Sequence, residues 1–465
     1  MIWGYRLSIS KRSKFPRPLP RLTRRGSFRK LRPRTTIEWH EVEKSVTLAD
    51  TPGLRTLRRH QAMTLSLLFI AGLVNFLDRS SLSIANTTVR EEMHLNGTEM
   101  GWLLSAFSLA YGFAQLPLID LLDRAGTRSV LGGGLILWSV AQMLTGGVRG
   151  YAAFLLLRVL LGVGEAPFYP AAIRSTREWF SSATRGRATA IMSSSQTIGL
   201  AVAPPVLTWI MLNVGWRAMF VLLGASGLIV AAAWIAFHRA YRDTIFGETE
   251  PPSVTAPQTA WKALIRQRAV WGMMLGWGGI NYTVWLYLAW LPGYLQDQRH
   301  LSLTKTGWVA AVPFLSGALG MLSNGVLSDK LTHTGISLTT IHRSNLVFGM
   351  IASAASTFVV VQSRSTLQAV AGISMALFFI HFAGTSGWGY VQAVSPLHYV
   401  ASLGALQNFA GFMIASAAPV LTGLLLDRTH SFETALGVCS AVTLLGALSY
   451  ATLAAPSGMH LNREA

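Results

Sequence analysis

Long apolar stretches recur along the chain between about residue 62 and residue 456, and short polar connections separate them. Each stretch is close to the roughly 20 residues that a helix needs to cross a bilayer. The stretches lack the period-two alternation of barrel strands, so helices must satisfy their backbone groups in lipid. The pattern predicts an all-α membrane protein with twelve spanning helices at about 62–89, 101–122, 130–148, 151–172, 188–211, 216–238, 270–295, 307–328, 343–363, 367–392, 400–426 and 433–455.

A polar connection of roughly 30 residues at 239–269, which contains Pro251, Pro252 and Pro257, divides these helices into two sets of six. We therefore expect five regions along the chain. They are a basic cytoplasmic tail (1–60), an N-terminal six-helix bundle (61–238), a cytoplasmic linker (239–269), a C-terminal six-helix bundle (270–456) and a short cytoplasmic tail (457–465).

The two sets of helices repeat each other in sequence. The stretch Leu121–Arg124 after the second helix corresponds to Gly325–Lys330 after the eighth, with the two aspartates 206 positions apart (329 − 123). The fifth helix carries Gln-x-x-Gly and Pro-Val-Leu-Thr from residue 196, and the eleventh carries Asn-x-x-Gly and Pro-Val-Leu-Thr from residue 408. Three correspondences at nearly one offset predict two bundles related by an axis along the membrane normal.

Composition agrees with this picture, because 51% of the residues are hydrophobic, 13% are charged and the mean hydropathy is +0.40. Soluble domains carry roughly 25% charged residues. The formal net charge of +19 could suggest a nucleic-acid partner, but residues 1–60 alone hold 16 basic and four acidic side chains. The charge therefore belongs to a tail and not to a folded basic domain, and we expect no nucleic-acid partner.

The basic tail should be largely disordered. Three explanations of it stay open: it binds the anionic cytoplasmic leaflet, it is an organelle-targeting segment, or it is an over-extended reading of the gene. In the short loops, 14 basic residues lie on the side of the N-terminus and seven on the other side. The positive-inside rule then predicts a multi-pass protein of the cell membrane with both termini in the cytoplasm.

Motifs of enzymes and cofactor sites are missing from the sequence. No G-x-x-x-x-G-K-[S/T] phosphate loop and no His/Cys spacing of a zinc site occur. The single cysteine, Cys439, cannot form an internal disulfide. We expect no enzymatic activity, no cofactor and no metal.

Four charged residues fall inside predicted spans: Asp78 and Arg79 on the first helix, and Arg158 and Glu165 on the fourth. A charge at the centre of a membrane helix costs about 2.5–3.5 kcal/mol, so each is a candidate functional residue. The alternative is that two buried salt bridges lock the helices together, although buried ion pairs stabilise proteins poorly. Two acids and two bases in one half fit better with a binding site that has a protonation switch.

The physical logic of such a switch is linkage between an anion and a proton. An arginine favours the ionised form of a nearby carboxylate. A substrate anion that takes up the arginine withdraws this effect, so the carboxylate binds a proton more readily. Anion and proton then favour each other's binding, as symport requires. Arginine suits the anion because it stays charged and can clasp a carboxylate with two N–H groups.

The segment Asn75–Ala85 (NFLDRSSLSIA) resembles the first-helix signature of the anion:cation symporter family in the major facilitator superfamily. That family includes bacterial galactonate, glucarate and hexuronate carriers. Further matches in the same order are Gly101-Trp102, Tyr111, Leu161 to Pro167 (LGVGEAP), Arg185 to Ala190 (RGRATA) and Gly215 to Arg217 (GWR). The resemblance covers about residues 60–455 and implies the major facilitator fold, with two pseudo-symmetric six-helix bundles.

The resemblance also implies roles for individual residues. Arg79 would bind the substrate, Asp78 would take part in proton coupling, and Glu165 would be a second proton site with Arg158 as its partner. Tyr111 and Gln196 match positions that contact the substrate from the N-terminal half. The matching positions of the other half, which contact sugar hydroxyls, are Thr385, Ser386, Trp388 and Asn408.

Charged residues after the second and eighth helices resemble the family's conformational latch. Asp123 would meet a helix N-terminus, where an acid is favourable, and Arg124 accompanies it; Asp329 and Lys330 repeat the pair. The alternative is charge that only sets the topology. Ile119 replaces the glycine that usually opens this loop, which puts the usual gate contacts in doubt. His381 on the tenth helix is better explained as a packing residue than as a proton relay.

These observations together predict a secondary active transporter that works as a monomer by alternating access. Its partners would be a small organic anion, a proton and the lipid bilayer, and symport of a sugar acid or related monocarboxylate is the leading hypothesis. The alternatives are an exporter, a sodium-coupled carrier or an aromatic-acid carrier of the same fold. A membrane receptor that has lost transport is disfavoured by the intact Asp78, Arg79, Arg158 and Glu165.

Overall fold

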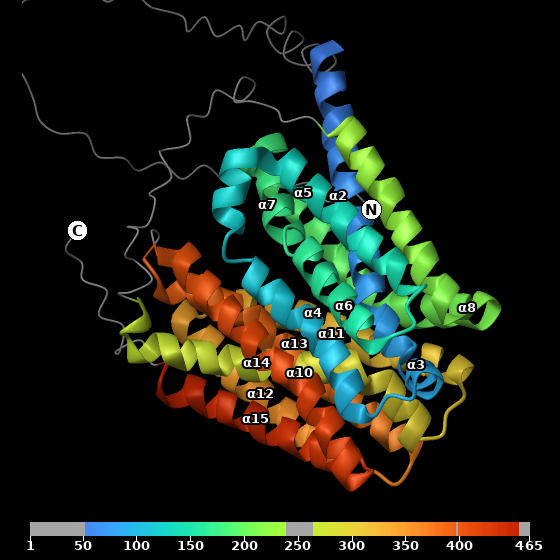
Figure 1. The fold of residues 1–465 in the computed structure, drawn as a ribbon. Coiled ribbons are helices and arrows are strands. Elements are labelled where there is room, and N and C mark those ends of the chain that lie inside the picture. Colours follow the sequence, from blue (N-terminus) through green and yellow to red (C-terminus); the bar gives the residue numbers. More distant parts are fainter. Residues whose placement is uncertain (1–51, 239–263, 397–398, 455–465) are drawn as a thin grey trace, which may run out of the picture. The chain divides into compact units, whose positions relative to one another are not determined.

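The computed structural model describes residues 52–238, 264–396 and 399–454, and every regular element in these ranges is a helix (Figure 1). The expectations for the basic tail before residue 52, for most of the linker and for the C-terminal tail lie outside the described residues. The helices of the N half are α2 (Pro52–Ile84), α3 (Asn86–Met93), α4 (Gly97–Ala114), α5 (Leu118–Thr145), α6 (Tyr151–Glu165), α7 (Phe168–Trp179) and α8 (Ser182–Phe237).

The C half begins with α10 and the short π-helix η2 that continues it. Its elements are α10 (Arg268–Gly293), η2 (Tyr294–Gln298), α11 (Leu303–Thr332), α12 (Leu338–Val361), α13 (Thr366–Val394), α14 (Val400–Thr429) and α15 (Glu433–Thr452). Their order and approximate bounds agree with the six apolar stretches predicted after residue 269, because the bilayer thickness sets a length that hydrophobicity alone reveals.

Helix α2 starts ten residues earlier than the sequence pattern predicted. Residues 52–60 were expected to be part of the disordered tail, but they extend the helix. The ring of His60 stacks on Trp179 with 5.7 Å between ring centroids, and the Gln61 side chain donates a hydrogen bond to the Trp179 carbonyl at 2.6 Å. These tertiary contacts join the end of α7 to a basic part of α2 that hydropathy does not identify.

Two glycines divide long helices into separate membrane spans. Gly126 inside α5 has φ 73° and Gly215 inside α8 has φ 80°, which are left-handed values that favour glycine. Prolines mark two further interruptions, since Pro117 separates α4 from α5 and Pro167 separates α6 from α7. With these breaks the helices make the twelve spans of the predicted fold. The predicted second and fourth spans are each built from two helices rather than one.

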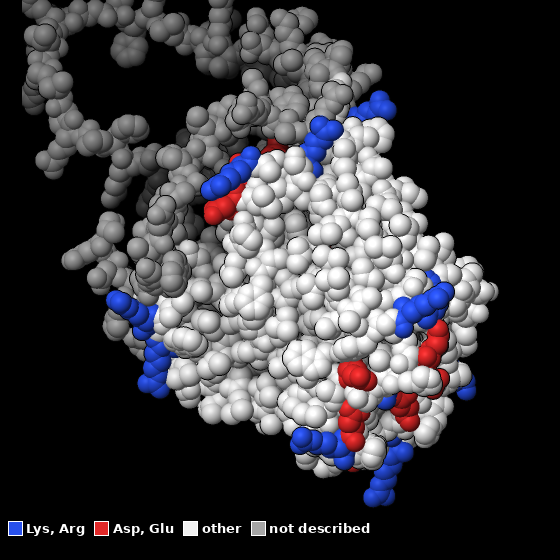
Figure 2. Space-filling model, viewed as in Figure 1, with Lys and Arg blue, Asp and Glu red and all other residues white. Residues whose placement is uncertain are grey.

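The described helices have the apolar character of membrane spans. Eight segments among them are long and apolar enough to cross a bilayer by length and composition alone. In the view of Figure 2, a broad band free of Lys, Arg, Asp and Glu lies between groups of charged side chains at the helix ends. Such a band matches the hydrocarbon region of a bilayer.

The two halves meet along two pairs of helices, α4 with α14 and α8 with α11. Small residues allow the close approach. A Cβ added at Gly101 of α4 would lie 2.6 Å from the carbonyl oxygen of Pro419 on α14, and one at Gly307 of α11 would lie 2.5 Å from Oγ1 of Thr208 on α8. Close contact of backbones at small residues is how helices pack in lipid.

The connections 85–96 and 294–302 lie at one end of the helices, which we call the α3 end. There, Glu92 of α3 accepts hydrogen bonds from Trp216 and Arg217, the residues that follow the break at Gly215. The hydrogen bond from Trp216 is the largest of the effects that lower the pKa of the Glu92 carboxyl. This contact joins the α3 connection to the turn inside α8, and it belongs entirely to the N half.

Candidate functional site

The centre of the candidate site is an ion pair between the first and fourth spans. Nε of Arg79 on α2 donates to Oε2 of Glu165 on α6 at 2.7 Å, and the two side chains are 10% and 0% exposed. Helix α6 ends at Glu165, where Pro167 interrupts the span. The break therefore puts the carboxylate at the end of a helix, opposite an arginine in the last two turns of α2.

Aromatic rings surround the Arg79 guanidinium. Its central carbon lies 5.1 Å from the ring centroid of Phe76, 5.3 Å from that of Phe107 and 4.8 Å from that of Tyr111. At these distances the ring faces attract the cation. The Tyr111 ring in turn contacts Phe412 of α14, with 4.7 Å between centroids. The rings around Arg79 therefore all belong to the N half, and one of them, Tyr111, contacts the C half through Phe412.

Arg158 contacts one ring of the same aromatic group. Its guanidinium carbon also lies 5.3 Å from the Phe107 centroid, and its Nε donates to the carbonyl oxygen of Leu103 at 3.1 Å. The resemblance implied that Arg158 is the partner of Glu165. In the structure the hydrogen bond to Glu165 comes from Arg79, because the two side chains meet directly across α2 and α6.

Several buried polar atoms of this region have no hydrogen-bond partner in the described structure. They include both oxygens of Asp78 and Nη1 of Arg158. Asp78, Asn75 and Glu165 are 0% exposed. Polar groups buried without partners are rare, because each costs about 1–3 kcal/mol and charged groups cost more. Their concentration beside one ion pair identifies a site built to take up further groups.

Of the predicted substrate contacts in the C half, two lie where they can face the junction of the halves. Asn408 of α14 donates to Oε1 of Gln115, just after α4, at 3.0 Å. Trp388 of α13 is 43% exposed and packs edge-on against Trp277, with 5.5 Å between centroids. Asn408 is thus already held by a side chain of the other half.

Ser386 and Thr385 are engaged inside the C half. The Ser386 hydroxyl is buried and shares hydrogen bonds with Asn324 of α11, at 2.9 and 3.1 Å, and with His342 of α12 at 3.3 Å. The Thr385 hydroxyl donates to the carbonyl of His381 in its own helix at 3.1 Å. The Ser386 side chain therefore faces the interior of the bundle, which differs from the contact with a sugar hydroxyl that the resemblance implied.

Gln196 is exposed on α8, in a stretch that packs against α2. A Cβ at Gly199, one turn later, would lie 2.7 Å from Cβ of Phe76, and one at Gly72 would lie 2.1 Å from the Ser195 hydroxyl. Phe76 is itself part of the Arg79 enclosure. The Gln196 side chain is therefore carried by a segment of α8 that contacts the helix of the charged cluster.

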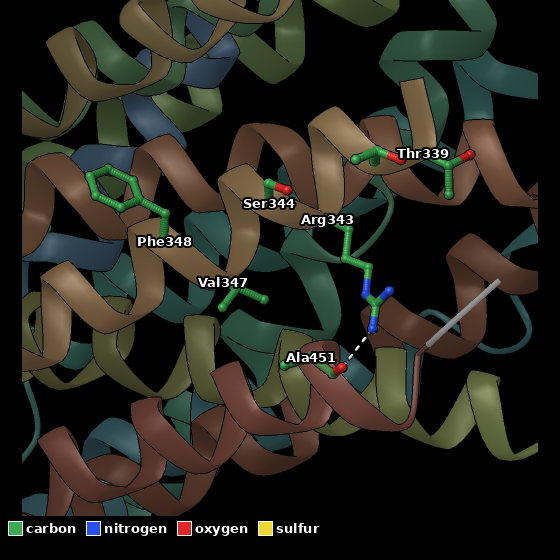
Figure 3. A pocket seen from close by; sticks show the side chains of 7 residues that line it. Thr339, Arg343, Ser344, Val347, Phe348 and Ala451 are labelled. Carbon is green, nitrogen blue, oxygen red and sulfur yellow. Dashed lines mark hydrogen bonds between the residues drawn. The ribbon is translucent and has the colours of Figure 1, made fainter. Parts of the chain in front are cut away.

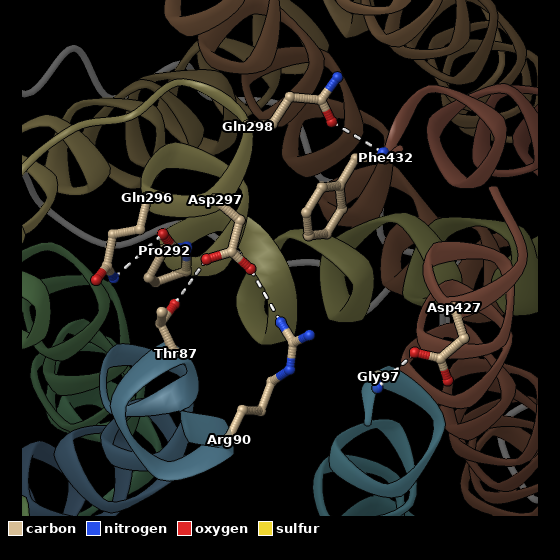
Figure 4. A network of polar contacts seen from close by, with 9 residues as sticks. All are labelled: Thr87, Arg90, Gly97, Pro292, Gln296, Asp297, Gln298, Asp427 and Phe432. Atoms are coloured by element: carbon tan, nitrogen blue, oxygen red, sulfur yellow. Dashed lines mark hydrogen bonds and ion pairs between the residues drawn. The ribbon is translucent and has the colours of Figure 1, made fainter. Parts of the chain in front are cut away.

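Contacts between the halves close the α3 end (Figure 4). Asp297 of η2 accepts from Thr87 at 3.1 Å and pairs with Arg90 at 2.9 Å, both on α3. Asp427, at the end of α14, accepts from the backbone N–H groups of Gly97 and Thr98, each at 2.7 Å, and from the Thr98 hydroxyl at 2.6 Å. The aspartate thereby satisfies unpaired N–H groups at the start of α4.

The predicted latch residues make different contacts. Asp123 forms an ion pair with Arg174 of α7 at 2.6 Å, with the Asp123 side chain 67% exposed. Arg124, Asp329 and Lys330 are exposed. The contact of an acid with a helix N-terminus, expected for Asp123, is made at the α3 end by Asp427.

Asp427, Asp297 and Arg90 were not identified from the sequence. One pattern could have found the first, because Leu-Leu-Asp-Arg occurs both at 121–124 and at 425–428. His381 behaves as the packing residue that was expected: its ring would contact a Cβ at Gly317, and its Nδ1 lies 2.9 Å from the Leu377 carbonyl oxygen of its own helix.

Comparison with known proteins agrees with this fold and site. The chain belongs to the Major Facilitator Superfamily, whose family model matches residues 68–419. It is therefore a multi-pass membrane transporter and not an enzyme. The predicted resemblance to sugar-acid carriers of this superfamily is confirmed by the similar proteins that follow.

A probable L-galactonate transporter of Escherichia coli (strain K12) is 46% identical over 404 residues, which cover 85% of this chain and 89% of that protein. A probable galactarate/D-glucarate transporter of the same strain is 31% identical over 423 residues, which cover 83% of this chain and 93% of that protein. Among solved structures, an inward-facing, unoccupied bacterial homologue of the human lysosomal transporter Spinster has a TM-score of 0.70 at 16% identity, covering 85% of this chain and 96% of the other. The latter comparison shows the fold alone.

Proposed function

We propose that this protein is a proton-coupled symporter of a sugar acid or a related monocarboxylate, in which Arg79 binds the carboxylate of the substrate. The observation that carries the proposal is the buried Arg79–Glu165 ion pair, with the rings of Phe76, Phe107 and Tyr111 around its guanidinium. The names of the similar proteins, which refer to galactonate, galactarate and glucarate, support this class of substrate.

Glu165 acts as an internal substitute for the substrate. Its carboxylate uses Nε of Arg79, while a guanidinium offers five N–H groups in a planar fork that fits a carboxylate. When Glu165 takes a proton, its attraction for Arg79 weakens and the guanidinium becomes free for the carboxylate of a sugar acid. The proton on Glu165 and the anion on Arg79 therefore stabilise each other's binding, which couples their movement.

Asp78 supplies a second place for a proton. Its two oxygens are buried without a hydrogen-bond donor, and an ionised carboxylate in such surroundings is far more costly than a neutral carboxylic acid. Arg158, which shares the Phe107 ring with Arg79, keeps a second positive charge beside both acids. We assign proton coupling to Asp78 and Glu165, with Arg158 as the cation that balances them.

Selection among sugar acids falls to the polar and aromatic groups at the junction of the halves. We assign this role to Tyr111, Gln196, Thr385, Trp388 and Asn408. Binding of a sugar hydroxyl to Asn408 would replace its hydrogen bond with Gln115, so substrate binding would loosen one contact between the halves. The closed contacts at the α3 end would open at a later step, and the exposed charges Asp123, Arg124, Asp329 and Lys330 would act at the opposite end.

The orientation in the membrane follows from the excess of basic residues in the loops on the side of the N-terminus. We propose that both termini lie in the cytoplasm, so that the α3 end faces outward. Fusion of alkaline phosphatase or a fluorescent protein after residue 465 tests this proposal. Fluorescence without phosphatase activity is the expected result, and active phosphatase would reverse the orientation.

The decisive test of the function is transport by purified protein in liposomes. We expect a proton gradient, inside alkaline, to drive accumulation of L-galactonate or another acid from a panel of sugar acids. The Glu165→Gln variant should lose this accumulation but retain exchange of labelled for unlabelled substrate, because exchange needs no net proton movement. Glu91→Gln is the matched control, since Glu91 is exposed on α3.

The same experiment separates the alternatives. Accumulation driven by a sodium gradient, or by aromatic acids in place of sugar acids, would replace the proposal with another carrier of the same fold. Undiminished proton-driven accumulation by Glu165→Gln would remove Glu165 from the coupling mechanism. If the protein is folded but no acid is transported, the alternative of a membrane receptor that has lost transport would be favoured.

A further inference from the structure

A cavity of about 430 Å³ lies on the C half, between the start of α12 and the end of α15 (Figure 3). Its volume falls within the range of small-ligand sites, roughly 300–1,000 Å³. The residues that line it are Thr339, Thr340, Arg343, Ser344, Val347, Phe348 and Ala451. This lining contains one cation, three hydroxyl groups and no acid. The cavity is distinct from the charged cluster of α2 and α6, and nothing in the transport mechanism uses it.

Arg343 is anchored by the last turn of α15. Its Nε donates to the carbonyl oxygen of Tyr450 at 3.1 Å, and one terminal nitrogen donates to that of Ala451 at 2.5 Å. An arginine often satisfies helix C-terminal carbonyls in this way. The two bonds use two of the five N–H groups and fix the plane of the guanidinium, while the cavity reaches the rest of the group.

The polarity of the lining changes along α12. Thr339, Thr340, Arg343 and Ser344 belong to the first two turns of the helix, whereas Phe348 lies nine residues after Thr339, about 14 Å further along the axis at 1.5 Å per residue. Phe348 is 58% exposed. The helices that pack most closely against α12 are α13 and α15, both of the C half. This face of α12 therefore looks away from the N half and toward lipid.

The cavity has a polar, cationic end at the membrane boundary and an apolar end toward the centre of the bilayer. This arrangement is complementary to the headgroup and acyl chain of one phospholipid. We propose that the cavity binds an anionic phospholipid of the surrounding membrane, with its phosphate on Arg343 and the hydroxyl of Ser344 and with an acyl chain along Val347 and Phe348. Basic pockets beside membrane helices are a known chemistry for anionic lipid headgroups. A soluble phosphate would use only the polar end of the lining.

The test compares lipid binding by variants of the full-length protein. Protein in detergent is titrated with phosphatidylglycerol or phosphatidylcholine, and bound lipid is counted by native mass spectrometry. We expect phosphatidylglycerol to bind more tightly to the wild type, and Arg343→Gln to weaken that binding about tenfold or more, the change that loss of a charge-assisted hydrogen bond produces. Arg268→Gln is the matched control, because Arg268 is exposed and lies outside the cavity.

Arg343→Gln can also loosen α15, so a second variant keeps the anchor intact. Ser344 is exposed, and Ser344→Phe should fill the cavity without touching the bonds to Tyr450 and Ala451. We expect it to weaken phosphatidylglycerol binding as much as Arg343→Gln does. Equal binding of the two lipids, or wild-type binding by Ser344→Phe, would overturn the proposal. Displacement of the lipid by millimolar inorganic phosphate would also overturn it, in favour of a soluble anion. Lipid binding is measured without transport, so a failure of the proposed transport function would change neither the lipid preference of the wild type nor the effect of the variants.

Discussion

Each half of this transporter holds a cluster of buried polar side chains, and the two clusters differ in how completely they are hydrogen-bonded. The N half holds two acids and two arginines in its membrane spans, and several of their polar atoms lack partners. The C half has a buried cluster of amide, hydroxyl and imidazole groups on α11, α12 and α13. Its members are Asn324, Ser328, His342, Asn345 and Ser386, which bond to one another at 2.9–3.3 Å.

This difference separates structural from functional polarity. A fully bonded network rigidifies a bundle and gains nothing from a further ligand. A partly bonded group of charges remains costly until a ligand or a proton completes it. Under the proposed function we place the coupling chemistry in the N half and give the cluster of the C half a supporting role. Four predictions follow this comparison.

The largest effect is expected at the ion pair. Arg79→Gln leaves the Glu165 carboxylate buried without its partner, which should lower the free energy of unfolding by about 3–5 kcal/mol. The double variant Arg79→Gln/Glu165→Gln should recover most of this loss and still fail to transport, because the anion site is gone. Unfolding in detergent and uptake in liposomes measure the two properties. A double variant as unstable as the single one would mean that the pair is not the origin of the loss.

The next effect is expected at Asp427, a residue of the C half that accepts three hydrogen bonds from the start of α4. Asp427→Asn weakens charge-assisted hydrogen bonds to α4, each worth about 1.5–3 kcal/mol, so opening of the α3 end should become about tenfold more frequent or more. A cysteine placed at Ser105, which bonds to the Ser416 carbonyl of α14, should then react faster with a thiol reagent.

The background for this measurement is favourable, because the natural Cys439 is fully buried. Asp120→Asn, an exposed acid on α5, serves as the control and should leave the rate unchanged. Equal reactivity in both variants would show that Asp427 does not hold the halves together.

A smaller effect is expected in the cluster of the C half. Ser386→Ala removes a partner of Asn324 and His342 and should cost about 1–3 kcal/mol of stability, while the number of protons carried per substrate stays the same. Measurement of unfolding and of transport stoichiometry distinguishes these outcomes. A changed preference among sugar acids would instead put Ser386 in the substrate site, as the family resemblance implied.

The smallest effect on stability is expected at the exposed pair Asp123–Arg174. Asp123→Asn should change the free energy of unfolding by no more than about 1 kcal/mol. If Asp123 acts as a latch, uptake should nevertheless slow, and Asp329→Asn, its counterpart in the repeat, should slow it as well. Unchanged uptake in both variants would mean that Asp123 and Asp329 only help to set the membrane topology.

Several features could be predicted from the sequence because the bilayer imposes them. The order and approximate bounds of the membrane spans follow from apolar length, although not the division of a span into two helices. The four membrane charges, Asp78, Arg79, Arg158 and Glu165, stand out because their cost in lipid makes them rare. The family could be identified from motifs that lie on these same helices.

Only the tertiary structure decided which groups meet. The sequence offered two arginines for Glu165, and the relative rotation of α2 and α6 selected Arg79. Helix rotation also turned Ser386 toward the interior of the C half. It brought Asp427 to the start of α4, where it bonds to Gly97, a residue 330 positions earlier in the chain. Hydropathy reports the depth of a residue along the membrane normal, but not the direction in which its side chain points. That direction comes from packing between helices, and it determines which buried side chains meet.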